Sequence, residues 1–168
     1  MPSLSRNILE LAVASSLFLL AAYTTPVSTD AVESMTPWER ATSTPKGQLK
    51  NPYTDFESVA KEGHRKYMAA GCNGCHGGTG GGGMAAPLTN PVWVYGDDDD
   101  TLFRVIAFGT GKLSPDDAFE KLDYERKGSE MMEGPMPHFG EIVKTDDDLW
   151  KIIAWMRSVY CERRASGC

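Results

Sequence analysis

The sequence has few features of a membrane-embedded or nucleic-acid-binding protein. Its one extended apolar run, from Leu11 to Ala22, spans about 12 residues, whereas a helix that crosses a bilayer needs roughly 20. Positive charge is also scarce, since 17 basic and 23 acidic residues give a formal net charge of −6. Such an acidic chain is poorly suited to bind nucleic acid, because its own field opposes the approach of phosphates. Strand patterns are absent apart from the short run Val92 to Tyr95, which favours a mainly α-helical protein with long loops.

Residues 1–31 have the pattern of a secretory signal peptide. Arg6 precedes the apolar run and small residues follow it, with Thr29, Asp30 and Ala31 as the favoured cleavage site. A retained N-terminal anchor is the alternative, and no cysteine that would take a lipid follows the run. In either case we expect the folded part outside the cytoplasm. Residues 32–168 have the size of one compact domain.

Residues 32–52 show neither a helical nor a strand period, and they include Pro37, Pro45 and Pro52. We therefore expect an extended arm or linker in this part of the chain, with Trp38 as a candidate contact to the domain surface. The folded domain is expected at residues 53–160, and residues 161–168 are expected to form a short C-terminal tail.

A first helix is expected after a capping box at residues 54–57, in which the Thr54 hydroxyl accepts from the amide three residues later. Apolar or small residues then recur at helical spacing as far as Tyr67, and Gly71 is expected to end the helix. Gly63 lies in the middle of this helix, where glycine costs on the order of 1 kcal/mol relative to alanine. We infer that the missing side chain lets another backbone approach closely.

The expected partner of this helix lies at the other end of the chain. Residues 145–148 form a second helix start, with carboxylates in the first turn, where the helix dipole favours them. Apolar residues then recur at helical spacing from Leu149 to Tyr160. A third helix is expected to begin near Asp99 and to end at Gly109.

The five residues from Cys72 to His76 carry the strongest functional signal. A bare C-x-x-C motif fits a redox dithiol, half of a zinc site or the attachment of haem c. The adjacent histidine separates these readings, because covalent haem needs two thiols for its vinyl groups and an imidazole that reaches the iron. No βαβ context favours a thioredoxin-like site, and Cys161 and Cys168 are spaced too widely for a second zinc-binding pair. We therefore expect one covalently bound haem, with thioethers from Cys72 and Cys75 and with His76 as an axial iron ligand.

The sixth iron ligand decides between electron transfer and ligand chemistry. Met136 is favoured, because prolines on both sides stiffen an extended backbone that can hold its thioether still. Met84 follows the histidine closely on a glycine-rich loop and would struggle to reach the far side of a porphyrin. His138 would give bis-histidine ligation. Met131 and Met132 remain candidates, although core packing is the usual role of methionine.

The order of these features resembles that of the class I c-type cytochromes. In that family the first and last helices cross at a glycine and an aromatic residue, and Gly63, Tyr67, Ile152 and Trp155 match these positions. Longer segments look like those of cytochrome cL: GCNGCHGG at 71–78, PLTN at 87–90, WVYG at 93–96, TLFR at 101–104, RKGSE at 126–130 and GPMP at 134–137.

This resemblance implies a class I cytochrome c fold, in which the N- and C-terminal helices cross around one covalently bound haem. It also implies that His76 and Met136 are the axial ligands. By resemblance the protein is a periplasmic electron carrier rather than an enzyme. It would take single electrons from a PQQ-dependent methanol dehydrogenase and pass them to another c-type cytochrome. The alternative is a haem c protein with a displaceable sixth ligand, acting as a small-molecule sensor or enzyme.

Two further clusters have simpler interpretations. Among the four aspartates at residues 97–100, Asp99 and Asp100 are expected to start a helix and the other two to be solvated. Bound Ca²⁺ is a less favoured alternative, because the EF-hand spacing is absent. Cys161 and Cys168 are expected to form a disulfide that clips the tail, since the compartment is oxidising.

Residues 77–83 hold six glycines and Thr79. The simplest interpretation is a flexible loop without a further role. The alternative is that the missing side chains leave a haem edge uncovered, so that a partner can approach closely. His64 lies on the charged face of the first helix and is expected to be solvated.

Overall fold

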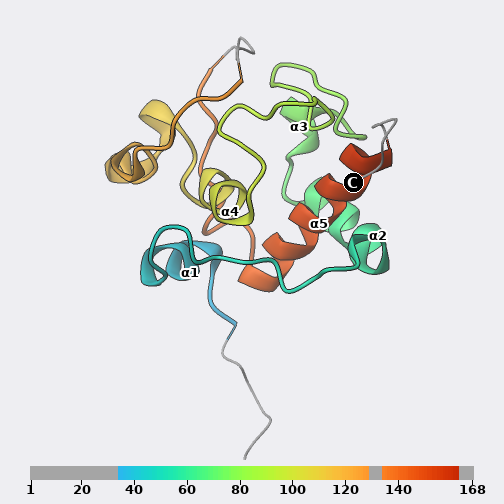
Figure 1. The fold of residues 1–168 in the computed structure, drawn as a ribbon, viewed down its shortest axis with the longest axis horizontal. Coiled ribbons are helices and arrows are strands. Elements are labelled where there is room, and N and C mark those ends of the chain that lie inside the picture. The colour runs from blue at the N-terminus through green and yellow to red at the C-terminus, as the bar shows by residue number, and fades with distance from the viewer. Residues whose placement is uncertain (1–33, 129–133, 163–168) are drawn as a thin grey trace, which may run out of the picture. The chain divides into compact units, whose positions relative to one another are not determined.

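The computed structural model describes residues 34–128 and 134–162, with side chains in the last helix described as far as Tyr160. No strand occurs in these residues, which confirms the mainly α prediction. The elements are α1 (Pro37–Ser43), α2 (Phe56–Ala69), α3 (Asn73–His76), α4 (Asp99–Phe108), the 3-10 turns η1 (Gly111–Leu113), η2 (Pro115–Asp117) and η3 (Glu120–Leu122), and α5 (Asp146–Glu162) (Figure 1). None of the described helices is long and apolar enough to cross a membrane.

Helices α2 and α5 cross in direct contact, as the mid-helix glycine predicted (Figure 1). A β-carbon at Gly63 would collide with the backbone carbonyl of Lys151 and would lie 2.9 Å from the β-carbon of Trp155. Ion pairs flank the crossing, with Lys66 Nζ 2.5 Å from Asp148 Oδ1 and Lys151 Nζ 3.1 Å from Glu62 Oε1. The absent side chain therefore allows the closest backbone approach between the two helices.

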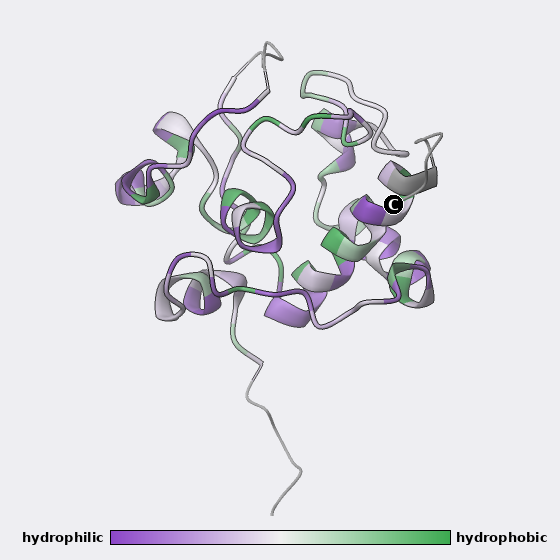
Figure 2. Cartoon of the chain, viewed as in Figure 1, coloured by the Kyte–Doolittle hydropathy of each residue, from purple (hydrophilic) through white to green (hydrophobic). Residues whose placement is uncertain are grey.

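The buried core gathers around α4 and α5, and both helices carry hydrophobic (green) segments in Figure 2. Phe103 and Ala107 of α4 are fully buried, and the Phe103 ring lies 4.4 Å from the ring of Trp150 in α5. Asp98 caps α4 by accepting a hydrogen bond from the Thr101 amide (2.9 Å). The helix ends at Gly109, with φ of 70°, as predicted.

The cap of α2 differs from the prediction. The N-cap is Asp55, whose carboxylate accepts from the Ser58 amide, so the expected capping box at Thr54 is wrong by one residue. Aspartate caps a helix at least as well as threonine, which makes adjacent candidates hard to separate from sequence. The cap of α5 is as predicted, since the Thr145 hydroxyl accepts from the Asp148 amide at 3.1 Å.

The extended arm expected at residues 32–52 is interrupted by a helix in its described part. Residues Pro37–Ser43 form α1, with a complete capping box between Thr36 and Glu39 and a proline in the first turn. Ala41 is buried, and the Trp38 amide donates to the Gly140 carbonyl at 3.0 Å. The helix-start pattern was present in the sequence, but the prolines around it obscured it.

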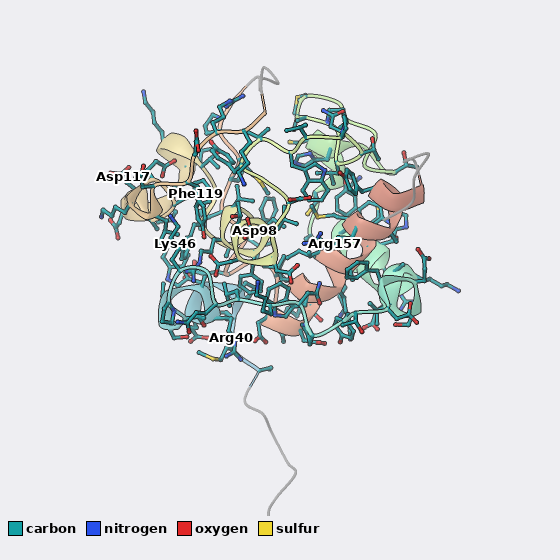
Figure 3. The ribbon with its side chains drawn as sticks, in the orientation of Figure 1. Arg40, Lys46, Asp98, Asp117, Phe119 and Arg157 are labelled. Atoms are coloured by element: carbon teal, nitrogen blue, oxygen red, sulfur yellow. The ribbon has the colours of Figure 1, made fainter. Side chains whose placement is uncertain are left out.

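Charged side chains fasten this N-terminal segment to the rest of the domain. Arg40, labelled in Figure 3, pairs with Asp146 at the start of α5, with 2.6 Å between Nε and Oδ2. Arg104 of α4 is almost fully buried and pairs with Asp100 at 2.9 Å. Its guanidinium also donates to three backbone carbonyls, those of Ala41, Thr44 and Pro45. The segment is therefore an integral part of the domain.

Asp100 is the buried anion of this arrangement. Burial works to raise the pKa of its carboxyl group, but hydrogen bonds from Arg104, from Tyr124 and from nearby backbone amides outweigh burial and hold the pKa at about 2. Asp100 does start α4 as predicted, yet it is 1% exposed, so its carboxylate neutralises a buried arginine rather than facing solvent.

Candidate haem-binding site

A cavity of about 330 Å³ lies among α2, α3, α4, α5 and the loops that join them. Cys72, Cys75, His76 and Met136 all line it, so the structure brings the four predicted site residues to one place. Of the described residues that line the cavity, none is aspartate, glutamate, lysine or arginine. The cavity therefore suits a largely apolar group.

The short helix α3 presents the cysteines and the histidine together. Its first turn is closed by the Cys75 and His76 amides, which donate to the Cys72 carbonyl at 3.3 and 3.1 Å. Tyr67 holds the preceding turn, because its carbonyl accepts from the Cys72 amide at 3.2 Å. Burial raises the pKa of the Cys72 thiol to about 11. The unattached thiol is therefore protonated near neutral pH.

His76 has a defined tautomer. Its Nδ1 lies 2.9 Å from the Ala86 carbonyl, which can only accept, so Nδ1 carries the proton and the lone pair remains on Nε2. Burial lowers the pKa of the imidazole, and the bond to Ala86 opposes that shift less strongly. A neutral imidazole oriented by a backbone carbonyl is the form in which histidine binds a metal.

The backbone that follows His76 is held by two side chains of α2. The His64 Nε2–H donates to the Gly78 carbonyl at 2.7 Å, and the Tyr67 hydroxyl donates to the Gly77 carbonyl at 2.6 Å. The His64 ring also stacks on Trp155, with 4.7 Å between ring centroids. His64 is thus only partly exposed, and the expectation that it is solvated missed these contacts. Its spacing of three residues from Tyr67 was the available signal, because such residues share a helix face.

The glycine-rich loop at residues 77–83 is packed against itself and against the α3 turn. A β-carbon at Gly77 would lie 2.8 Å from the Gly82 carbonyl oxygen, and one at Gly83 would lie 2.8 Å from the Cys75 carbonyl oxygen. Both positions thus require glycine for close backbone approach. Within residues 77–88, those that line the cavity are residues 84–88, and none of the six glycines of the loop does so. The loop supports the α3 turn and lies outside the cavity wall.

Met136 is half-buried, and its backbone is fixed by Thr110. The Thr110 amide donates to the Met136 carbonyl at 2.8 Å, and the Met136 amide donates to the Thr110 hydroxyl at 2.9 Å. Sequence reasoning missed Thr110, whose only signal was its position directly after the helix end.

The other candidates for the sixth ligand are placed less favourably. Met84 borders the cavity but is 60% exposed. His138 is not among the lining residues, and its ring meets Trp38 edge-on, with 6.3 Å between centroids. Met131 and Met132 lie outside the described residues.

Trp93 supplies a test of whether the cavity fits a haem. Its indole Nε1 is buried, it has no hydrogen-bond partner in the described residues, and the residue lines the cavity. A buried N–H without an acceptor costs about 1–3 kcal/mol, so a bound group that carries an acceptor relieves this cost. A haem fits, because it combines a wide apolar ring with polar groups at its edge.

The calcium alternative has no support in the described residues, which contain no cluster of three acidic, histidine or cysteine side chains able to hold a metal ion. The aspartates of the run have other partners. Asp98 caps α4, and the Asp99 carboxylate accepts from Arg157 at 2.6 Å (Figure 3 labels Asp98 and Arg157). The predicted disulfide between Cys161 and Cys168 falls on side chains outside the described residues.

The fold and the cavity define a small helical protein with an uncharged, largely apolar cavity beside two cysteines and a histidine. The Cytochrome c family model matches residues 60–160, and the chain belongs to the cytochrome c family. The predicted class I cytochrome c fold is confirmed, and membership implies covalently bound haem c and an electron-transfer role. The chain matches no curated protein and no solved structure.

Proposed function

We propose that this cytochrome carries single electrons outside the cytoplasm, from a PQQ-dependent methanol dehydrogenase to another c-type cytochrome. The electron-transfer part of the proposal is based on His76 and Met136, which line one apolar cavity. A hydrogen bond holds the ring of His76, and another holds the backbone of Met136. Two firmly held ligands leave no open coordination position for a substrate.

The chain's own residues would act as follows. Cys72 and Cys75 would form the thioethers, His76 would hold the iron through Nε2, and Met136 would hold it through the thioether sulfur. Haem c supplies the iron that gains and loses one electron. The apolar cavity walls exclude water, and the Ala86 carbonyl keeps the proton on Nδ1 of His76.

The contact surface for the redox partner is proposed at the cavity rim. Met84 and Val92 border the cavity and are 60% and 53% exposed. An exposed apolar rim without charged lining residues favours close contact with another protein, which shortens the distance for electron tunnelling. The net charge of −6 would act at longer range and steer a partner that carries a basic surface.

The particular donor is proposed from the resemblance to cytochrome cL. Two of the segments that carry this resemblance, residues 93–96 and the described part of 126–130 (residues 126–128), meet in the structure. The amides of Lys127 and Gly128 both donate to the Val94 carbonyl, at 2.6 and 3.1 Å. Residues 93–96 line the cavity, and Lys127 and Gly128 hold them from behind through Val94, which supports reading the two segments as a single feature.

The proposed donor is tested by mixing the oxidised cytochrome with PQQ-dependent methanol dehydrogenase and methanol. Reduction of the haem should follow, with a rate that falls as salt is added, because an acidic carrier and a basic partner attract each other less in salt. Omitting methanol is the control. Absence of reduction, in a sample that a chemical reductant does reduce, would contradict the dehydrogenase as donor and leave a cytochrome with another partner.

A further inference from the structure

Thr110 makes both backbone hydrogen bonds of Met136. It is 3% exposed and follows Gly109, the C-cap of α4. Its amide donates to the Met136 carbonyl (2.8 Å), and its hydroxyl accepts from the Met136 amide (2.9 Å). A single buried residue therefore satisfies the donor and the acceptor of the peptide groups on either side of the methionine.

The prolines beside Met136 make the hydroxyl contact important. Pro135 and Pro137 have no backbone N–H, so Met136 supplies the only amide donor in this three-residue stretch. The Thr110 hydroxyl accepts that donor. A valine in place of Thr110 would keep the shape of the side chain but leave this amide without its acceptor.

The loop that carries Met136 is also attached to the C-terminal end of α4. The Phe139 amide donates to the Ile106 carbonyl and the Gly140 amide to the Ala107 carbonyl, both at 2.9 Å. At Gly109 a β-carbon would lie 2.6 Å from the Met136 carbonyl oxygen, so loop and helix end pack backbone against backbone. Ala107 is fully buried, and the loop is thus attached to a part of the core that cannot shift easily.

We propose that Thr110 is a positioning residue for the sixth ligand, and that its hydroxyl decides how readily another molecule displaces Met136 from the haem iron. This inference rests on the proposed ligation by Met136. Loss of one buried hydrogen bond loosens the loop, so the methionine competes less well with a small external ligand. The backbone bond from the Thr110 amide remains in every side-chain variant.

The test is an imidazole titration of the oxidised, haem-loaded protein, followed through the absorption band of methionine-ligated haem. Thr110→Val should bind imidazole about tenfold more tightly than the parent protein, on the scale of one buried hydrogen bond. Thr110→Ser keeps the hydroxyl and should stay within about twofold of the parent. Thr101→Val is the matched control, because it also removes a buried threonine hydroxyl. That hydroxyl donates to Asp98 at 2.7 Å and lies in the first turn of α4, at the opposite end of the helix from Thr110.

Equal imidazole affinity in Thr110→Val and the parent would overturn the proposal. An equal rise in Thr101→Val would also overturn it, because the effect would then be a general loosening of the domain. If Thr110→Val fails to take up haem, Thr110→Ala and Thr110→Ser make the same comparison with smaller side chains. Equal imidazole affinity of those two variants would contradict the role of the hydroxyl.

Met136→Ala distinguishes failure of the ligand assignment from failure of the role of Thr110. Persistence of the methionine band there would refute the ligand assignment, whereas its loss beside an unaffected Thr110→Val would refute only the role of Thr110.

Discussion

Gly63 of α2 lies directly against the backbone carbonyl of Lys151 in α5, with no space for a single methyl group. The obstacle is backbone on both sides, so side-chain rotation cannot relieve it. The crossing of the two long helices, which frames the haem cavity, therefore depends on one missing side chain.

Gly63→Ala should lower the free energy of unfolding by about 2 kcal/mol, because the overpacking exceeds the roughly 1 kcal/mol that alanine gains in helix propensity. Urea denaturation of the haem-loaded protein measures this. Gly78→Ala is the control, since a β-carbon there meets no atom within 4 Å. Equal stability of Gly63→Ala and the parent would show that the helices can separate at the crossing without loss.

Asp100 should make stability depend on pH in the acid range. Its pKa is held at about 2, below the ordinary value of 3.8, so on acidification the unfolded chain takes up the proton first. The contribution of Asp100 is therefore complete above about pH 4 and is lost as the pH falls towards 2.

Asp100→Asn should destabilise the protein by about 3 kcal/mol at neutral pH, because it leaves the buried Arg104 without its anion. The variant should also lose stability less steeply than the parent between pH 4 and pH 2, as measured by denaturation at a series of pH values. Asp97→Asn removes the same charge from an exposed side chain and serves as control. Identical acid profiles of Asp100→Asn and the parent would contradict the role assigned to this carboxylate.

The cavity rim should control the rate of electron entry. Met84→Lys places a charge among apolar contacts and should slow reduction by the proposed donor dehydrogenase about fivefold, equivalent to roughly 1 kcal/mol at the contact. Stopped-flow reduction measures the rate, and an unchanged absorption spectrum shows that the haem is intact. Met68→Lys introduces the same charge at an exposed methionine away from the cavity. The same rate in both variants would place the contact surface elsewhere.

Met136→Ala should convert the haem to a high-spin state, because the other described methionines that line the cavity are placed differently from Met136: Met84 is 60% exposed, and Met156 lies within helix α5. Absorption spectroscopy of the oxidised variant measures the spin state. His138→Ala is the matched change two residues away, and it should leave the spectrum as it is. A low-spin spectrum in Met136→Ala would assign the sixth ligand to another residue.

Local patterns predicted much of this structure. The haem motif at residues 72–76, the end of α4 at Gly109 and the cap of α5 at Thr145 each depend on a few neighbouring residues, and such signals are readable in sequence. The role of Gly63 at the α2–α5 crossing could be predicted for a different reason. Glycine in the middle of a helix lowers helix stability, so its presence there indicates a contact that offsets this loss.

The features that were missed depend on contacts between distant parts of the chain. Helix α1 has its own cap, but its place in the core depends on a hydrogen bond from Arg104 to the Ala41 carbonyl. These two residues are more than sixty positions apart in the sequence. His64 is held by a loop carbonyl, and Thr110 by the backbone of Met136, 26 residues further on. A backbone carbonyl or amide leaves no trace in residue identity, so these partners become visible only in three dimensions.

The most direct test of the account is the absorption spectrum of the reduced protein before and after addition of carbon monoxide. If His76 and Met136 hold both axial positions and the protein is an electron carrier, the oxidised form shows the methionine band and carbon monoxide leaves the reduced spectrum unchanged. A high-spin spectrum with ready binding of carbon monoxide would contradict the account and identify a haem protein with an open sixth position.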